Sequence, residues 1–214
     1  MALSLQIQAY EQIKSKILSL EYPPNAIISE ASLLHDLDMS RTPVRESLIK
    51  LEHEHFVKIL PKRGILVLPL SLADVNMIFD TRLLIEPFCL KTYYKHIPKQ
   101  ELDQLCKDIC QFDAADTDRF YQMDDQIHRL IAASGPNSYL NTTLQHAYDQ
   151  HNRIRVLANP NISERYQTAM NEHIDILHAI QAGNIETAAK LLTEHLKTSK
   201  TIDILALTAS DIPI

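Results

Sequence analysis

The chain has 214 residues, of which 45% are hydrophobic, and it carries a formal net charge of −6. This length allows one large core or two modest ones, and the acidic balance excludes a uniformly basic protein that coats nucleic acid without discrimination. Residues 1–70 contain 8 basic and 8 acidic side chains, whereas the remainder contains 13 and 19. The first third of the chain is therefore relatively the more basic part.

Neither the cysteines nor the hydropathy pattern indicates export or membrane insertion. The 3 cysteines form no CxxC pair and are too few for a disulfide framework, which favours a reducing compartment. The N-terminus, MALSLQIQAY, lacks the basic region of a signal peptide. No apolar run approaches the roughly 20 residues that span a bilayer. We therefore expect a cytoplasmic protein that does not enter membranes.

The first two predicted helices lie within residues 1–40. Apolar residues recur at helical spacing from Ile7 to Leu20, and Tyr22-Pro23-Pro24 ends this helix. A second, short helix is expected from about Glu30 to Leu37. It is followed by a turn at Asp38-Met39, where Asp can adopt a left-handed conformation.

A third helix and a hairpin complete the N-terminal third. The helix is expected to begin near Thr42, as N-cap, with Pro43 at the first helical position. Two apolar, β-branched runs at 56–60 and 65–68 predict strands, and Gly64 can take a positive φ in the turn between them. Helix, helix, turn, helix and hairpin is the order of a winged helix-turn-helix.

The start of the third helix and the hairpin tip carry groups suited to nucleic acid. A helix that enters a major groove needs donors in its first turn, and the arginine fork can engage guanine O6 and N7 together. The candidates are Ser40, Arg41, Thr42 and Arg45 on the helix and Lys62 and Arg63 on the wing, where they would reach phosphate or the minor groove. The alternative is that these are ordinary solvated charges.

The remainder of the chain predicts an all-α bundle. We expect six helices, at 72–95, 99–112, 118–134, 138–158, 163–182 and 184–207. Breaks between them are marked by Pro98, Gly135-Pro136 and Gly183-Asn184. A bundle of about this size can enclose a ligand cavity.

Four side chains of the bundle are candidates for a metal site. Asp124 and His128 are four residues apart and so share one helix face. His173 precedes Gly183 by ten residues and His195 follows it by twelve, so an antiparallel helix pair bent at Gly183 would bring both imidazoles to a similar level. One carboxylate and three imidazoles suit Zn²⁺ foremost, with Ni²⁺ or Mn²⁺ as alternatives. The alternative is accidental spacing, because the chain has 10 histidines.

Arginines of the bundle are candidates for binding an acidic effector. Arg82 is placed either as a carboxylate clamp in the cavity or in an intrahelical ion pair with Glu86. Arg153 and Arg155 are weaker candidates, and one of the two is expected to face solvent.

Residues 9–70 resemble the DNA-binding domain of GntR-type bacterial regulators. The likeness covers IISEASLLHDLDMSRTPVRESLIKLEHEHFVKILPKRGILV, and SRTPVRE is its most specific segment. The turn reads Leu37-Asp38-Met39 where the family usually has Leu-Gly-Val, and Ala31 stands where many members have an arginine. The DNA contacts that the resemblance implies are Ser40, Arg41, Thr42, Pro43, Arg45, Lys62, Arg63 and Gly64.

Residues 71–207 resemble the FCD ligand-binding domain of the FadR subfamily. The segments that carry the likeness are DDQIH, EHIDILHAIQAG and AAKLLTEHL. The resemblance implies a metal bound by Asp124, His128, His173 and His195, with Asp125 as the fallback for Asp124. It also implies effectors that are small organic acids or sugar acids. A carboxylate oxygen would fill an open position on such an ion.

Together these features predict a bacterial transcriptional regulator, in particular a repressor, rather than an enzyme. Residues 1–70 would bind DNA, and residues 71–214 would bind metal and effector and form a homodimer on a pseudo-palindromic operator. A regulator that senses the metal directly is one alternative. A metal-dependent hydrolase or isomerase is another, but the sequence nominates no general base or nucleophile for it.

Overall fold

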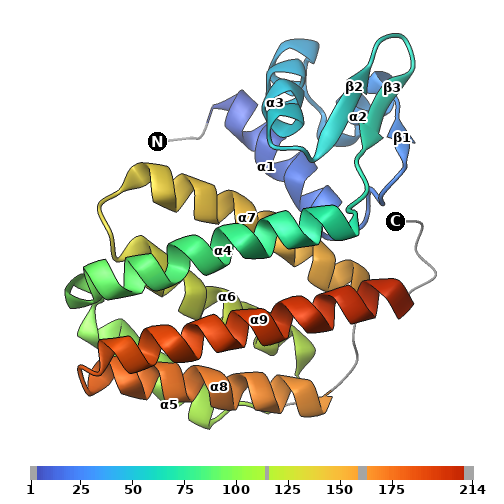
Figure 1. Ribbon diagram of the computed structural model, residues 1–214. Coiled ribbons are helices and arrows are strands. Elements are labelled where there is room, and N and C mark those ends of the chain that lie inside the picture. Colours follow the sequence, from blue (N-terminus) through green and yellow to red (C-terminus); the bar gives the residue numbers. More distant parts are fainter. Residues whose placement is uncertain (1–3, 114–115, 159–162, 210–214) are drawn as a thin grey trace.

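The structure is a computed structural model that describes residues 4–113, 116–158 and 163–209, and Figure 1 shows a smaller N-terminal unit above a larger bundle of helices. The N-terminal unit comprises α1 (Leu5–Leu18), β1 (Ile27–Ile28), α2 (Glu30–Leu37), α3 (Arg41–His53), β2 (Val57–Leu60) and β3 (Gly64–Val67). The bundle comprises α4 (Leu72–Tyr93), the 3-10 helix η1 (Tyr94–His96), α5 (Lys99–Cys110), α6 (Thr117–Ala133), α7 (Ser138–Ala158), α8 (Ser163–Gln181) and α9 (Ile185–Ala209). The predicted fold class, a winged helix-turn-helix followed by an all-α bundle, is confirmed.

The helix-turn-helix is built from local capping and one left-handed residue. Ser29 caps α2 by accepting a hydrogen bond from the backbone N–H of Ser32 at 3.0 Å. Asp38 ends α2 with φ 50° and ψ 45°, the left-handed conformation expected there. The first helix ends at Leu18, two residues before the predicted end, and Leu20 itself has φ 61°. A separate hydrophobic core, drawn from α1, α2, α3 and the sheet, holds this unit together.

The start of α3 differs from the prediction. The N-cap is Ser40 rather than Thr42, and Pro43 is the third residue of the helix rather than the first. Proline is tolerated anywhere in the first turn, because the N–H groups there have no intrahelical acceptor. The helix therefore begins earlier, and Arg41 belongs to its first turn.

The wing is the hairpin of a three-stranded antiparallel sheet with strand order β1-β3-β2. Both hairpin strands were predicted, whereas β1 was not. It has only two residues, which pair with Leu66 and Ile65 of β3. Gly64 has φ 115°, and a Cβ at this position would lie 2.6 Å from the carbonyl oxygen of Ile28. Glycine is thus required where the hairpin closes on β1.

The six predicted helices of the bundle are confirmed to within two residues at the described ends. A capping box between Ser71 and Asp74 starts α4. Gly183, with φ 75°, separates α8 from α9, which pack against each other. In Figure 1, α9 runs beside α4 on one side and α8 on the other. None of the described helices is long and apolar enough to cross a membrane.

Helix α7 of the bundle also contacts the N-terminal unit. It packs against α4, α6 and α9 of the bundle and also against α1. The side-chain amide of Gln150 donates to the carbonyl oxygen of Glu54 at 2.8 Å. Lys14 of α1 lies 2.7 Å from the carboxylate of Asp149. Polar contacts thus join α7 to the N-terminal unit, although each unit has its own hydrophobic core.

Candidate functional site

The first turn of α3 presents polar side chains to solvent. Arg41 and Arg45 are 63% and 59% exposed, and Ser40 and Thr42 are also exposed. The side chain of Pro43 is buried under the helix start. Hydroxyl and guanidinium groups in this position suit phosphate oxygens and base edges. The structure thus leaves the predicted contact residues of α3 accessible to a duplex, except for Pro43.

The wing adds two further cations beside α3. Lys62 and Arg63 are exposed in the β2–β3 turn, next to the partly buried Gly64. A hollow of about 480 Å³ separates α3 from the hairpin, and its lining includes Arg45, Lys62 and Arg63. The charges predicted from both elements therefore border one groove.

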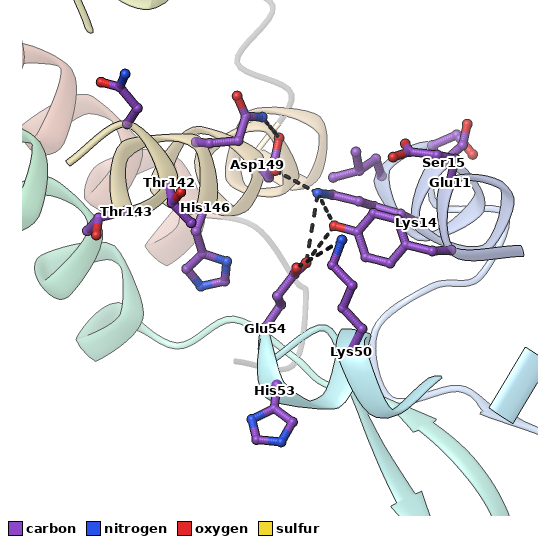
Figure 2. A pocket seen from close by; sticks show the side chains of 15 residues that line it. Glu11, Lys14, Ser15, Lys50, His53, Glu54, Thr142, Thr143, His146 and Asp149 are labelled. Carbon is purple, nitrogen blue, oxygen red and sulfur yellow. Dashed lines mark hydrogen bonds and ion pairs between the residues drawn. The ribbon is translucent and has the colours of Figure 1, made fainter. Parts of the chain in front are cut away.

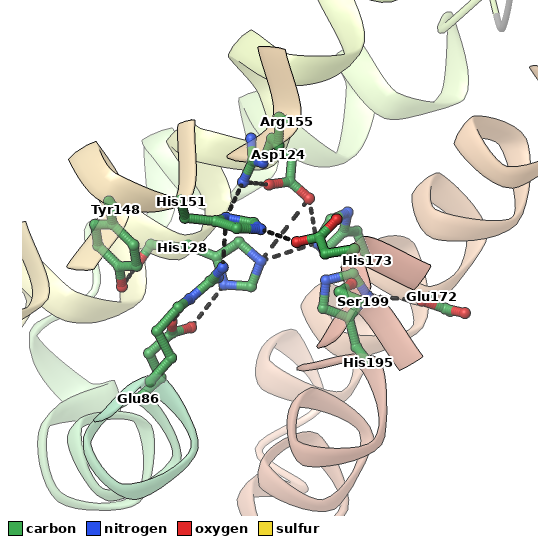
Figure 3. Close-up of polar contacts among 12 residues, drawn as sticks. Glu86, Asp124, His128, Tyr148, His151, Arg155, Glu172, His173, His195 and Ser199 are labelled. Atoms are coloured by element: carbon green, nitrogen blue, oxygen red, sulfur yellow. Dashed lines mark hydrogen bonds and ion pairs between the residues drawn. The ribbon is translucent and has the colours of Figure 1, made fainter. Parts of the chain in front are cut away.

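The four candidate metal ligands lie together in the bundle, as Figure 3 shows. Asp124 and His128 come from α6, His173 from α8 and His195 from α9, and all four are buried. One ligand atom of each lies within 4.8 Å of the others. The Nε2 atoms of His128 and His173 are 3.4 Å apart. Two nitrogens bound to one tetrahedral ion at about 2.0–2.1 Å are separated by about 3.3 Å, so this spacing fits a metal.

Two carboxylates hold the imidazoles from outside. Glu86 of α4 lies 2.6 Å from Nδ1 of His128, and Glu172 of α8 lies 2.6 Å from Nδ1 of His195. Each contact leaves Nε2 of the ring for the centre of the cluster. Metal-bound histidines ordinarily have such a partner, which fixes the tautomer and orients the ring. This role was not predicted from the sequence for either residue. Only Glu172 could have been suspected, because it directly precedes the candidate ligand His173 in the chain.

The electrostatics of the cluster favour the protonation states that bind metal. Burial lowers the pKa of His173 well below its usual range, and burial also lowers that of His195. Both rings are therefore neutral, the form that coordinates cations. Burial alone would raise the pKa of Asp124, but the charge of the Arg155 guanidinium outweighs it, so the net pKa is well below normal. The donor set suits a borderline divalent ion.

A buried network of basic groups adjoins the cluster. Arg82 donates to Glu86 at 2.6 Å and to Nδ1 of His151 at 2.8 Å, and Arg155 contacts Asp124 and the same His151 nitrogen. Because His151 Nδ1 accepts from two guanidinium groups, its proton is on Nε2, which lies 2.8 Å from Asp203. The predicted ion pair of Arg82 with Glu86 is therefore present, whereas its role as a carboxylate clamp stays a prediction.

Arg153 lies elsewhere, which corrects its predicted place in the effector site. Its guanidinium donates to the carbonyl oxygen of Leu68 and to Gln150, on the side of α7 that faces the N-terminal unit. The expectation that Arg153 or Arg155 faces solvent is also wrong, because both are buried. The reason is that α7 is covered on two sides, by the bundle and by the segment that leads into α4.

The space beside the cluster is small. A cavity of about 50 Å³ is lined by Asp124, His151, Arg155 and Asp203, among others. A water molecule occupies about 30 Å³ in the liquid, so this volume suits solvent rather than an organic acid. Two guanidinium nitrogens, Nη2 of Arg82 and Nη1 of Arg155, are buried without a hydrogen-bond partner among the described residues. Unsatisfied donors of this kind favour an anion.

A larger hollow of about 1230 Å³ lies between α7 and the N-terminal unit, as shown in Figure 2. Lys14 crosses it, donating to Tyr10 Oη at 2.7 Å and to Asp149 Oδ2 at 2.7 Å. The carboxylate of Glu54 accepts from Tyr10 and lies 3.9 Å from the Lys14 ammonium. Because Lys14 is only 12% exposed, this contact between the units is largely shielded from solvent.

Comparison with known families identifies both units. Residues 5–67 match the bacterial regulatory proteins of the gntR family, and residues 77–198 match the FCD domain. The chain belongs to the GntR family and has an FCD domain. It is therefore a transcriptional regulator of the GntR/FCD type.

Relatives and solved structures agree with this family. The repressor RspR of Escherichia coli is 25% identical over 194 residues, which cover 89% of this chain and 85% of RspR. The fold of E. coli McbR/YncC matches with a TM-score of 0.81 at 18% identity, covering 96% of this chain and all of that one. The Zn²⁺-bound FCD domain of TM0439 matches with a TM-score of 0.57 at 25% identity, over 66% of this chain and 99% of that one.

Proposed function

We propose that this regulator is a repressor of the FadR subfamily that binds a pseudo-palindromic operator as a homodimer and releases it when a small acid binds beside a metal ion in the bundle. Residues 1–70 bind DNA, and residues 71–214 bind metal and effector, although 1–3, 114–115, 159–162 and 210–214 lie outside the described residues. The observation that carries the proposal is the buried cluster of Asp124 and three histidines beside two guanidinium nitrogens that lack a hydrogen-bond partner among the described residues.

The ligands of the ion are Asp124, His128, His173 and His195. Zn²⁺ is the first candidate, because the relative TM0439 has a Zn²⁺-bound FCD domain, and Ni²⁺ and Mn²⁺ suit the same donors. When bound, the ion supplies a positive charge that attracts a carboxylate oxygen. Glu86 and Glu172 orient the imidazoles of His128 and His195.

The acid-binding groups of the protein are Arg82 and Arg155. Each carries a buried N–H-bearing nitrogen without a partner among the described residues, and a carboxylate or sugar acid offers the acceptors that these donors lack. We assign this role to Arg155 in place of Arg153, which contacts Leu68 on the other side of α7. Entry of the acid requires movement of side chains, because the cavity measures only about 50 Å³.

Helix α7 provides a physical route from this site to the DNA-binding unit. His151 and Arg155 on one face contact the basic network, whereas Asp149, Gln150 and Arg153 on another contact α1, Glu54 and Leu68. A ligand that displaces Arg155 therefore acts on the same two turns that position the N-terminal unit. The coupling free energy required between effector binding and DNA binding is of the usual size, about 1–3 kcal/mol.

The exposed face of α4 is suited to a second copy of the chain. Met77, Leu84 and Phe88 recur on one side of the helix and are all exposed. An isologous interface must complement itself, and an antiparallel copy would place Met77 against the partner's Phe88. Leu84→Glu should therefore give a monomer in analytical ultracentrifugation. Leu205→Glu, which changes another exposed leucine, on α9, should leave the dimer intact.

The experiment that tests regulation is a titration of operator binding by fluorescence anisotropy. The operator is first selected from random duplexes with the full-length protein. A panel of small carboxylic and sugar acids is then added to Zn²⁺-loaded and to chelated protein. We expect an acid that weakens binding about 5- to 150-fold in the loaded protein only, and an effect reduced in Asp149→Asn. If no acid changes binding in either form, the proposed effector control is wrong.

Direct metal sensing is the second candidate function, and the small volume of the cavity favours it. In that case Zn²⁺ alone changes operator affinity, and no acid adds to the effect. The relatives found are transcriptional regulators, so we propose no catalytic role for the cluster.

A further inference from the structure

Glu30 connects two arginines of α3, the recognition helix of the helix-turn-helix. It is the first residue of α2, directly after the N-cap Ser29. Its carboxylate accepts from Arg45 through two bonds, Nε to Oε1 at 2.7 Å and Nη2 to Oε2 at 3.2 Å. The same Oε1 lies 3.2 Å from Nε of Arg41. One carboxylate thus bridges two guanidinium groups that lie four residues apart on α3.

The geometry of this bridge distinguishes it from an isolated surface ion pair. Arg41 and Arg45 would otherwise repel each other, because like charges four residues apart in a helix are neighbours. Glu30 is 27% exposed, less than half the exposure of either arginine, so it holds them from the protein side. It also lines the hollow between α3 and the wing, together with Arg45 and Lys62.

The contact selects which edge of Arg45 remains for DNA. A guanidinium group can offer two parallel N–H bonds from its side edge, Nε with Nη2, or from its end, Nη1 with Nη2. Glu30 occupies the side edge. Glu30 does not use the end of the fork, Nη1 with the second N–H of Nη2, and these two nitrogens match O6 and N7 on the major-groove edge of guanine.

We propose that Glu30 is a positioning residue that sets the DNA specificity of this regulator, by fixing Arg45 for an end-on contact with guanine. This inference rests on the proposed reading of DNA by α3. The carboxylate has a second effect, because its negative charge opposes the attraction between the two arginines and any phosphate. Binding to non-operator DNA depends almost wholly on such attraction, so Glu30 weakens it more than it weakens operator binding.

The test compares Glu30→Gln with Glu46→Gln in the full-length protein. Glu46 is exposed on α3 itself, so both variants remove one negative charge near the groove. Dissociation constants are measured for the selected operator and for a scrambled duplex over a range of salt concentrations. We expect Glu30→Gln to lower the ratio of operator affinity to scrambled-duplex affinity about tenfold. A loss of this size lies within the range by which one bidentate side-chain contact discriminates between bases. Glu46→Gln should change this ratio less than about twofold.

A second measurement separates positioning from general damage to the fold. Each guanine of the operator half-site is replaced in turn, and the loss of affinity is compared between the parent and Glu30→Gln. Loss of discrimination at one base pair only, the one that Arg45→Ala also ignores, supports the proposal. An unchanged operator ratio in Glu30→Gln, an equal loss in Glu46→Gln or a uniform loss at all positions overturns it. If Arg45→Ala binds operator as the parent does, the proposed reading of DNA by α3 fails instead.

Discussion

The recognition helix and the bundle both place arginines beside carboxylates, but they do so in opposite environments. Arg45 is 59% exposed and shares Glu30 with Arg41. Arg82 is 1% exposed, and its partner Glu86 is fully buried. An exposed pair contributes little to stability and is available to a macromolecule, whereas a buried pair is costly to desolvate and costly to break. The same residue types thus form an exposed ion pair in one unit and a buried ion pair in the other.

The largest expected difference between the two regions is in stability. Arg82→Ala should lower the free energy of unfolding by about 3–5 kcal/mol, because it leaves Glu86 as a buried charge without its main partner. Arg45→Ala should lower it by no more than about 0.5 kcal/mol, since its side chain is exposed. Urea unfolding of both variants measures this. Equal effects would mean that burial does not separate the two regions.

Metal binding should show the next largest effect. Zn²⁺ at about 1,000 times its dissociation constant stabilises a folded protein by about 4 kcal/mol, so chelation should lower the melting temperature of the parent. In His195→Ala the metal content and this chelator effect should both fall. His178→Ala, which removes an exposed histidine of α8, is the matched control. Undiminished zinc in His195→Ala, measured by elemental analysis, would remove that residue from the ligand set.

The smallest expected effect is a pH dependence of stability, which tests how strongly burial shifts the pKa of a carboxylate. Burial raises the pKa of Asp203 from 3.8 to about 7, against the opposing effect of Arg155 and Arg82. Between these values the folded chain binds more protons at Asp203 than the unfolded chain, so the associated stability is present at low pH and lost as pH rises.

The measurement for Asp203 compares chelated parent and Asp203→Asn proteins in urea. The parent should lose stability more steeply than the variant, by up to about 1.4 kcal/mol between about pH 5 and pH 6. Parallel pH profiles would show that Asp203 titrates as an exposed carboxylate does.

Much of the fold could be predicted because it depends on local rules. The helix pattern, the left-handed turn at Asp38 and the hairpin at Gly64 follow from residues a few positions apart. The proximity of His173 to His195 could also be predicted, because Gly183 fixes the level at which two antiparallel helices meet. Where local signals competed, prediction failed, because Ser40 rather than Thr42 occupies the N-cap position of α3.

The rest of the site depends on contacts between distant elements. Glu86 reaches His128 from α4, and a carboxylate in a helix gives no sign of such a partner. The different surroundings of Arg155, which contacts Asp124, and Arg153, which contacts Leu68, have a similar cause. Two residues along a helix differ by about 200° in direction, so which one faces the cluster depends on how α7 is rotated, and that follows from packing rather than from sequence spacing.

Lys14 has a consequence for anyone who recombines regulators of this kind. Its ammonium joins Tyr10 of the N-terminal unit to Asp149 of α7, so the two units are matched at a shielded polar contact. A chimera that takes its first 70 residues from another regulator must bring a compatible partner for Asp149. Otherwise Asp149 keeps only its contacts with Gln145 and Arg129 of the bundle, and the polar contact that joins the two units is lost.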